Sequence, residues 1–274
     1  MNDIGPIGRI QKRRAAIATL KLLAHEAAHC VVIHYSCESF DGEGARKSPR
    51  ITSIAVQNLA SGQTTSFSIS IMAEIRKLPH DEIIRHYDEL ERAMLKEFYE
   101  YMKMHLSYKW IHWAMRDANY GFSALEHRCR ILGEEVHRIS EQNLFDLHML
   151  LKDKYSRSYM ENPRLVNLID KNEFSKRDFL SGKDEAEAFE NQDYWRMHRS
   201  TLRKVHNIAN IFNHAASDTL RHNARWQDIW GLDISGLVTL VKEHWIVTCI
   251  VILGSVFTLI VRFSDVWKLM NRHS

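Results

Sequence analysis

Hydrophobic and polar residues follow one another along most of this chain with the spacing of helices. The segment from Ile17 to Ile33 has no Pro or Gly and is rich in Ala, Leu and Val, which predicts a largely buried helix. Beyond residue 80 the pattern is again helical. We expect helices over 81–115, 123–152, 173–189 and 194–223, with breaks at 120–121 and 155–163.

Two segments rich in β-branched residues predict strands instead. Residues 50–57 (RITSIAVQ) and 63–70 (QTTSFSIS) flank a short connection that contains Gly62, a pattern typical of a strand pair. The preceding segment, Ser36–Pro49, carries two glycines and a proline and is typical of a loop. The sequence therefore predicts an α+β domain that is mainly α-helical, with a small β-hairpin next to the first helix.

A further apolar stretch lies near the C-terminal end. Residues 245–261 (WIVTCIVILGSVFTLIV) carry no charge and are flanked by Lys242 and Arg262, which is typical of a membrane-spanning helix, although a buried core helix is the alternative. Residues 1–14 lack the apolar core of a secretory signal. We therefore expect a folded domain over 1–235 in the cytoplasm and a single-pass transmembrane anchor with a short tail over 236–274.

Composition excludes some classes of protein. A hydrophobic content of 45% with 26% charged residues is typical of a globular chain rather than a disordered one. The net charge of +3 comes from dispersed Lys and Arg, so nucleic acid is not an expected partner. The four cysteines form no C-x-x-C pair, which argues against a zinc knuckle and against a disulfide framework.

The motif H-E-A-A-H at residues 25–29 is the strongest candidate for chemistry. In a helix, residues four apart share a face, so His25 and His29 would present two imidazoles to one Zn²⁺. Glu26 beside them would polarise a metal-bound water. The motif predicts a zinc metalloendopeptidase, and the alternative is two ordinary histidines beside a surface glutamate.

The segment Ala24–Val32 and the strand pair after it resemble the start of the peptidase domain of the FtsH family, the membrane-anchored AAA+ zinc proteases. In that family a helix bearing A-x-H-E-A-G-H-A-x-V leads into a strand and a glycine-containing turn; here Ala28 stands in place of the Gly, and Cys30 in place of the Ala after the second His. The resemblance implies an FtsH-like metallopeptidase domain in which His25 and His29 are metal ligands and Glu26 is the catalytic acid/base. The family's ATPase module is absent, because no G-x-x-x-x-G-K-[ST] motif occurs.

The resemblance also implies a third metal ligand, an Asp in a later helix within the pattern N-D-L-x-x-A. The nearest local match is Ser123–His127, where an alanine stands in place of that Asp. Asp117, just upstream, is our first choice for the third ligand, and Glu126 is the second. A site that uses Glu134 or Glu135 is a further alternative.

Together these interpretations predict a zinc-dependent peptidase that acts on unfolded or flexible polypeptides without an ATPase of its own. Its expected partners are a polypeptide substrate, the membrane through the C-terminal helix, and either further copies of itself or a separate unfoldase. The rival hypothesis is a non-catalytic, membrane-tethered helical scaffold with a structural or degenerate metal site. A zinc ion with an open coordination position would favour the enzyme, and a closed shell of four protein ligands would favour the scaffold.

Overall fold

A computed structural model describes residues 6–38, 48–116, 120–230 and 245–270 of the chain. Its strands are β1 (Cys30–Cys37), β2 (Ile51–Asn58), β3 (Thr64–Ser68), β4 (Lys109–His112) and β5 (Leu144–Asp146). Its α-helices are α1 (Pro6–His25), α2 (Ile69–Ile75), α3 (Tyr87–Met104), α4 (Phe122–Ile131), α5 (Leu147–Tyr155), α6 (Arg164–Lys171), α7 (Gly182–Glu190), α8 (Tyr194–Ala216), α9 (Trp226–Trp230) and α11 (Trp245–Met270). Short 3₁₀ turns are η1 (Ala27–His29), η2 (His80–Glu82), η3 (Glu141–Asn143) and η4 (Arg157–Tyr159).

The five strands form one mixed sheet in the order β3-β2-β1-β4-β5. β2 runs antiparallel to both β1 and β3, whereas β1, β4 and β5 are parallel to one another. Ile33 pairs with His112, and His112 pairs with Asp146. The carboxyl ends of the three parallel strands therefore lie at one edge of the sheet.

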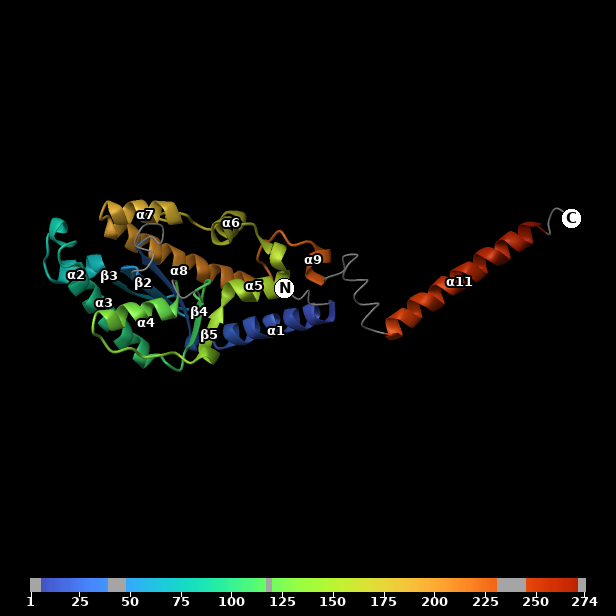
Figure 1. Cartoon of the computed structure of the whole chain (residues 1–274), viewed down its shortest axis with the longest axis horizontal. Helices are drawn as coiled ribbons and strands as arrows, with labels where there is room; N and C mark the ends of the chain where they lie inside the picture. The colour runs from blue at the N-terminus through green and yellow to red at the C-terminus, as the bar shows by residue number, and fades with distance from the viewer. Residues whose placement is uncertain (1–5, 39–47, 117–119, 231–244, 271–274) are drawn as a thin grey trace.

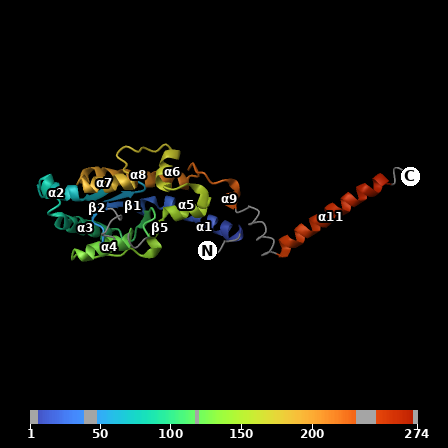
Figure 2. The ribbon, with the colours of Figure 1, turned by 45° about the horizontal axis from the view of Figure 1, so that its top comes forward.

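Helices cover both faces of this sheet, with α8 on one side and α3 and α4 on the other (Figures 1 and 2). The central strand β1 contributes to both hydrophobic cores. Val31, Ile33 and Tyr35 pack in the core with α3 and α4, while Cys30 and Val32 pack in the core with α1, α5 and α8. β1 is therefore buried on both faces, as is typical of strands in sheets that are covered by helices on both sides.

The predicted helix over Ile17–Ile33 is wrong in its second half. α1 ends at His25, and after η1 the chain enters β1 at Cys30. The residues that follow Cys30 are β-branched (Val31, Val32, Ile33), and such side chains lose rotamer freedom in a helix but pack well on a pleated surface. A strand that is buried on both faces has a continuous apolar run, which resembles the run of a buried helix.

The predicted strand pair is confirmed, but the sheet is larger than a hairpin. β2 and β3 are antiparallel, with Ser53 opposite Ser68 and Gln57 opposite Thr64. β4 lies inside the predicted helix 81–115, and β5 lies inside the predicted helix 123–152. Both strands are too short to produce an alternating pattern, so their residues were absorbed into the neighbouring helical pattern.

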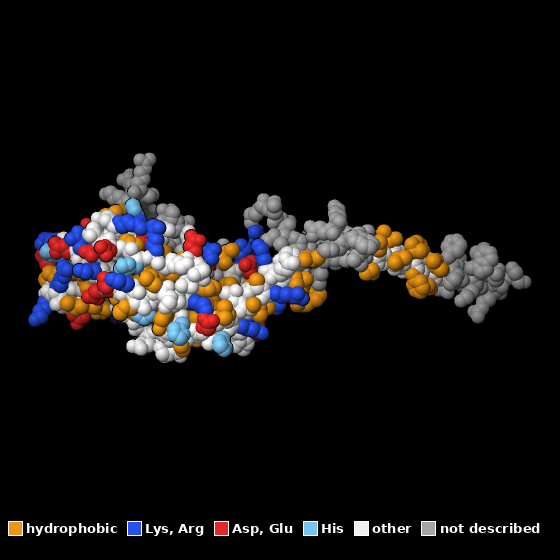
Figure 3. All heavy atoms as spheres, turned by 90° about the horizontal axis from the view of Figure 1, so that it is seen from below, with side chains coloured by type: hydrophobic (Ala, Val, Ile, Leu, Met, Phe, Trp, Pro, Cys, Tyr) orange, Lys and Arg blue, Asp and Glu red, His pale blue; other side chains and the backbone are white. Residues whose placement is uncertain are grey.

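The predicted transmembrane anchor is also corrected. Among the described residues, no helix combines the length and the apolar character needed to cross a membrane. Leu253 and Phe257 on α11 are exposed, and Figure 3 shows hydrophobic side chains along the described part of the helix. The absence of a membrane-spanning helix among the described residues overturns the anchor over 236–274 and the single-pass membrane localisation. The predicted domain boundary at 235/236 lies outside the described residues.

A buried histidine joins α8 to the sheet. His198 is 4% exposed, and its Nδ1 lies 2.7 Å from the Ser53 hydroxyl on β2. Its Nε2 lies 3.5 Å from the hydroxyl of Ser66 on β3. Burial lowers the pKa of His198 from 6.5 to about 4, so the folded protein keeps this ring neutral in mildly acidic solution.

We expect acid to destabilise the fold between about pH 6.5 and pH 4 partly through His198. In this window the unfolded chain protonates the ring while the folded chain does not, so the unfolded state binds more protons and the free energy of unfolding falls as the pH falls. His198→Gln should flatten this dependence in urea unfolding measured from pH 7 to pH 4.5. His127→Gln, at an exposed position on α4, is the control. Equal pH slopes in the two variants would contradict the assignment.

Candidate ligand-binding site at the carboxyl edge of the sheet

The H-E-A-A-H residues lie at a junction between a helix and a strand. His25 is the last residue of α1, Glu26 precedes η1, and His29 is the last residue of that turn. The Glu26 amide donates to the carbonyl of Leu22 at 3.0 Å, whereas the His29 amide donates only three residues back, to the Glu26 carbonyl, at 2.8 Å. The two histidines therefore do not share the face of one α-helix, and this part of the prediction is wrong.

Glu26 takes part in an ion pair. Its carboxylate accepts a hydrogen bond from the ammonium of Lys109, the first residue of β4. His25 and His29 are exposed, and the His29 ring meets the ring of Tyr108 edge-on with 5.5 Å between centroids. One oxygen of this carboxylate, Oε2, is thus paired with a cation rather than directed at a metal-bound water.

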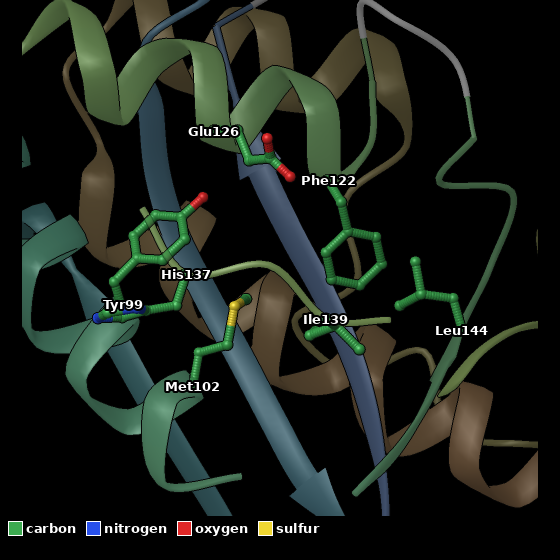
Figure 4. A pocket seen from close by; sticks show the side chains of 7 residues that line it. All are labelled: Tyr99, Met102, Phe122, Glu126, His137, Ile139 and Leu144. Atoms are coloured by element: carbon green, nitrogen blue, oxygen red, sulfur yellow. The ribbon is translucent and has the colours of Figure 1, made fainter. Parts of the chain in front are cut away.

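Among the residues that the structure describes, none is brought to these histidines as a third ligand. Asp117, the first choice, lies outside the described residues. Glu126 projects from α4 beside a cavity of about 30 Å³ that His137 also lines (Figure 4), and its carboxylate accepts hydrogen bonds from Arg130 and Arg138, both at 2.9 Å. In the part of the chain that the structure describes, no three His, Cys, Asp or Glu side chains are grouped so that they could hold a metal ion. As placed, these residues do not fit a zinc peptidase centre.

Polar side chains do gather at the carboxyl edge of the parallel strands. β2 lies beside β1 on one side of the sheet, and β5 lies beside β4 on the other side. The order in which strands are added to the sheet therefore reverses between β1 and β4. In open α/β sheets, ligands bind outside the carboxyl ends of the strands at such a switch point. Two cavities of about 300 and 320 Å³ lie at this edge, and we call them the β1 cavity and the β4 cavity.

The β1 cavity lies where the end of β1 meets α7 and α8. The polar side chains around it that matter here are His34, Ser36, Glu38, Tyr120, Glu185 and Lys204. The His34 and Ser36 side chains follow Val32 at alternate positions of β1, so all three share the face of the sheet that α8 covers. The cavity is therefore built on a rigid strand and two helices.

A nearly buried ion pair forms one wall of the β1 cavity. The Lys204 ammonium lies 2.7 Å from Oε1 of Glu185, and their side chains are 8% and 16% exposed. The same oxygen accepts hydrogen bonds from the hydroxyls of Ser36 at 2.8 Å and Ser200 at 3.3 Å. Three donors thus hold one oxygen of Glu185 in place, as a charge removed from water requires.

His34 presents a hydrogen-bond acceptor. The Tyr120 hydroxyl donates to the Tyr35 carbonyl at 3.0 Å and lies 3.2 Å from Nδ1 of His34. A hydroxyl has one proton, so both contacts are satisfied when Nδ1 of His34 donates to the Tyr120 oxygen. Burial, and secondarily the charge of Lys204, hold the pKa of His34 well below its usual value, so the ring is neutral and Nε2 carries a lone pair.

The neighbouring thiol does not add a nucleophile to this cavity. Cys37 lines it beside Ser36, but burial, followed by the charge of Glu185, raises the pKa of the thiol. A thiol that stays protonated is a poor nucleophile and a poor metal ligand. The arrangement therefore favours binding over covalent chemistry.

Sequence reasoning did not single out His34, Glu185 or Lys204. A signal existed for the first, because His34 and Ser36 interrupt an apolar strand at alternate positions and so mark one face. No comparable signal existed for Lys204, since a lysine within an amphipathic helix is usually solvated. Its burial depends on contacts with Glu185 on a different helix.

Comparisons with known proteins do not supply a function. No protein-family model, curated protein or solved structure matches the chain. The resemblance to FtsH proteases, the zinc cofactor and the peptidase activity stay predictions that rest on the motif at residues 25–29.

The zinc content of the purified protein distinguishes the prediction made from the motif from the expectation based on the structure. The motif predicts about one zinc per chain, lost in His25→Ala or His29→Ala. The 3₁₀ turn and the ion pair of Glu26 with Lys109 lead us to expect background zinc that neither substitution changes. Stoichiometric zinc that disappears in either variant would contradict this expectation and restore the metallopeptidase hypothesis.

Proposed function

We propose that this protein binds a small ligand that carries a protonated amine, and that the amine occupies the β1 cavity. The main support for the proposal is His34, whose ring is neutral and nearly buried. This ring lines a cavity of about 300 Å³, and its Nε2 has a lone pair that can accept a hydrogen bond there. Nε2 has no hydrogen-bond partner among the described residues, and those residues do not fully enclose it. It is therefore accessible to a donor in the cavity.

Charge complementarity supports the same class of ligand. Among the described residues that line the cavity, Glu38 and Glu185 carry two negative charges and Lys204 carries one positive charge, which leaves one negative charge in excess. Oε1 of Glu185 is occupied by its three donors, so the second oxygen of that carboxylate is the one available to a ligand. Acceptors that surround a cavity with excess negative charge favour a cationic donor group.

Charge repulsion from Lys204 limits the affinity of the β1 cavity for a cation. The Lys204 ammonium repels a second cation and also lowers the pKa of His34, so the ion pair with Glu185 offsets this repulsion only in part. The ligand amine should therefore lie nearer to Glu38 than to Lys204. Hydrogen bonds that involve a charged group contribute about 1.5–3 kcal/mol each, enough for measurable binding.

A peptidase remains the alternative that the motif predicts, in the form of a zinc enzyme acting on flexible polypeptides. No observation at residues 25–29 favours it over amine binding. The two hypotheses use different parts of the molecule, so each can fail without the other.

Titration with methylammonium and 1,4-diaminobutane, followed by two-dimensional amide NMR, tests the proposal. We expect saturable shifts at residues 34–38 and 185–186, which sodium chloride at equal ionic strength does not reproduce. Glu38→Gln should weaken binding about tenfold, because it replaces a charged acceptor by a neutral one and leaves the ion pair of Lys204 intact.

Glu187→Gln, at an exposed position on α7, is the matched control and should bind like the wild type. Absence of saturable shifts in the wild type would refute amine binding. Equal weakening in the Glu38 and Glu187 variants would show that general electrostatics, rather than the cavity, causes the effect.

A further inference from the structure

The β4 cavity lies at the same edge but on the opposite face of the sheet. Trp110 packs in the core with α3 and α4, and side chains two apart on a strand share a face, so His112 lies on that side. The His112 ring meets Phe122, the first residue of α4, edge-on with 5.7 Å between centroids. Nothing argued above for the β1 cavity uses these residues.

The turn after β4 is held in an unusual conformation. Ala114 has φ of 53°, in the left-handed region that residues other than glycine seldom adopt. Its amide donates to Oδ1 of Asp146 at 3.2 Å, and the amide of Met115 donates to Nδ1 of His112 at 3.2 Å. Backbone strain of this kind persists where surrounding bonds enforce it, and it concentrates at functional sites.

These bonds fix the tautomer of His112. Because Nδ1 accepts from the Met115 amide, the proton of the neutral ring is on Nε2. His112 is 1% exposed, and its Nε2 has no hydrogen-bond partner among the described residues. The described residues also do not fully enclose Nε2, so the N–H group faces the cavity that the ring lines.

A second set of donors converges on the same space. Arg116 forms a bridge with Gly121, which places it beside the start of α4. That helix is 10 residues long, its N-cap Gly121 supplies no side-chain bond, and its first turn contains no acidic residue. Its first amides therefore lack side-chain partners, and the hydroxyl of Ser123 lies among them at the cavity wall.

We propose that the β4 cavity binds an anionic group, a phosphate or a carboxylate, between Nε2–H of His112, the Arg116 guanidinium and the N-terminus of α4. Helix N-termini and Arg side chains both bind such groups. The imidazole N–H makes this more than an uncapped helix, because it is a further donor, fixed by the Met115 amide, that is open to an acceptor in the cavity. The cavity of about 320 Å³ admits a small molecule rather than an ion alone.

Two carboxylates stand near this site, and they act differently. Asp146 is 4% exposed and is engaged by the amides of Ala114 and Met149 and by Nε of Arg116, at 3.2, 3.3 and 3.4 Å. Glu141 lines the cavity and is exposed, so it opposes an anion. This opposition gives the proposal a test in which one substitution must strengthen binding.

The arrangement excludes a Ser-His-Asp hydrolase built from Ser123, His112 and Asp146. In such a triad the carboxylate accepts from Nδ1–H and Nε2 takes the proton of the serine. Here Nδ1 is itself an acceptor and Nε2 carries the proton, so His112 cannot act as the base. The residues are placed to hold a ligand.

Calorimetric titration of the full chain with inorganic phosphate and, separately, with acetate at constant ionic strength tests the proposal. We expect saturable binding of at least one of them, and the stronger one identifies the anionic group. Arg116→Gln should weaken it about tenfold or more, since a charge-assisted bond is lost. Arg14→Gln, at an exposed position on α1, should leave it unchanged.

Glu141→Gln decides the case if the Arg116 variant folds poorly, because Glu141 is exposed and its substitution should tighten anion binding several-fold. Weaker or unchanged binding in Glu141→Gln, or no saturable binding of either anion to the wild type, would overturn the proposal. Binding of methylammonium to the β1 cavity uses other residues, so its success or failure is read independently of this result.

Discussion

The burial of β1 between two helical layers is the constraint on which the rest of this structure depends. Its alternate residues enter two separate hydrophobic cores, so β1 has no polar face until it approaches its carboxyl end. A strand of this kind needs partners on both edges, and β2 and β4 supply them. Once β1 is fixed, the directions of α1 and α8 and the position of the carboxyl edge follow.

The same alternation separates the polar groups at that edge. His34 follows Val32 onto the face covered by α8, where Glu185 and Lys204 form their ion pair. His112 follows Trp110 onto the opposite face, beside the start of α4. The sheet thus divides one edge into two cavities. On one face the groups open to a ligand are acceptors, whereas on the other His112, Arg116 and the first amides of α4 are donors that lie beside the carboxylates of Glu141 and Asp146.

The sequence contained part of this account. The β2–β3 pair was predictable because each strand is long enough, and sufficiently rich in β-branched residues, to show its pattern. β1 was misread because a strand that is buried on both faces has no alternation, and its run continued from the apolar residues of α1. That error bears on the zinc hypothesis, which stays a prediction, since the value of H-E-A-A-H depends on both histidines lying in one helix.

The polar groups of the two cavities were less accessible to sequence reasoning. The sequence around Lys204 and around Arg116 does not distinguish either side chain from a solvated surface cation. Their roles arise from non-local contacts: Lys204 with Glu185 on α7, and Arg116 with Asp146 at the end of β5. Such contacts appear only when the order and direction of the strands are known, and two of those strands were too short to be predicted.

We infer that His34 and His112 are both neutral and carry their protons on opposite ring nitrogens. A long-range ¹H–¹⁵N correlation spectrum of the histidine rings at neutral pH measures this directly, with His34→Gln and His112→Gln to assign the signals. The account predicts a protonated Nδ1 in His34, next to Tyr120, and a protonated Nε2 in His112, whose Nδ1 accepts from Met115. The same tautomer in both rings, or a charged ring in either, would contradict it.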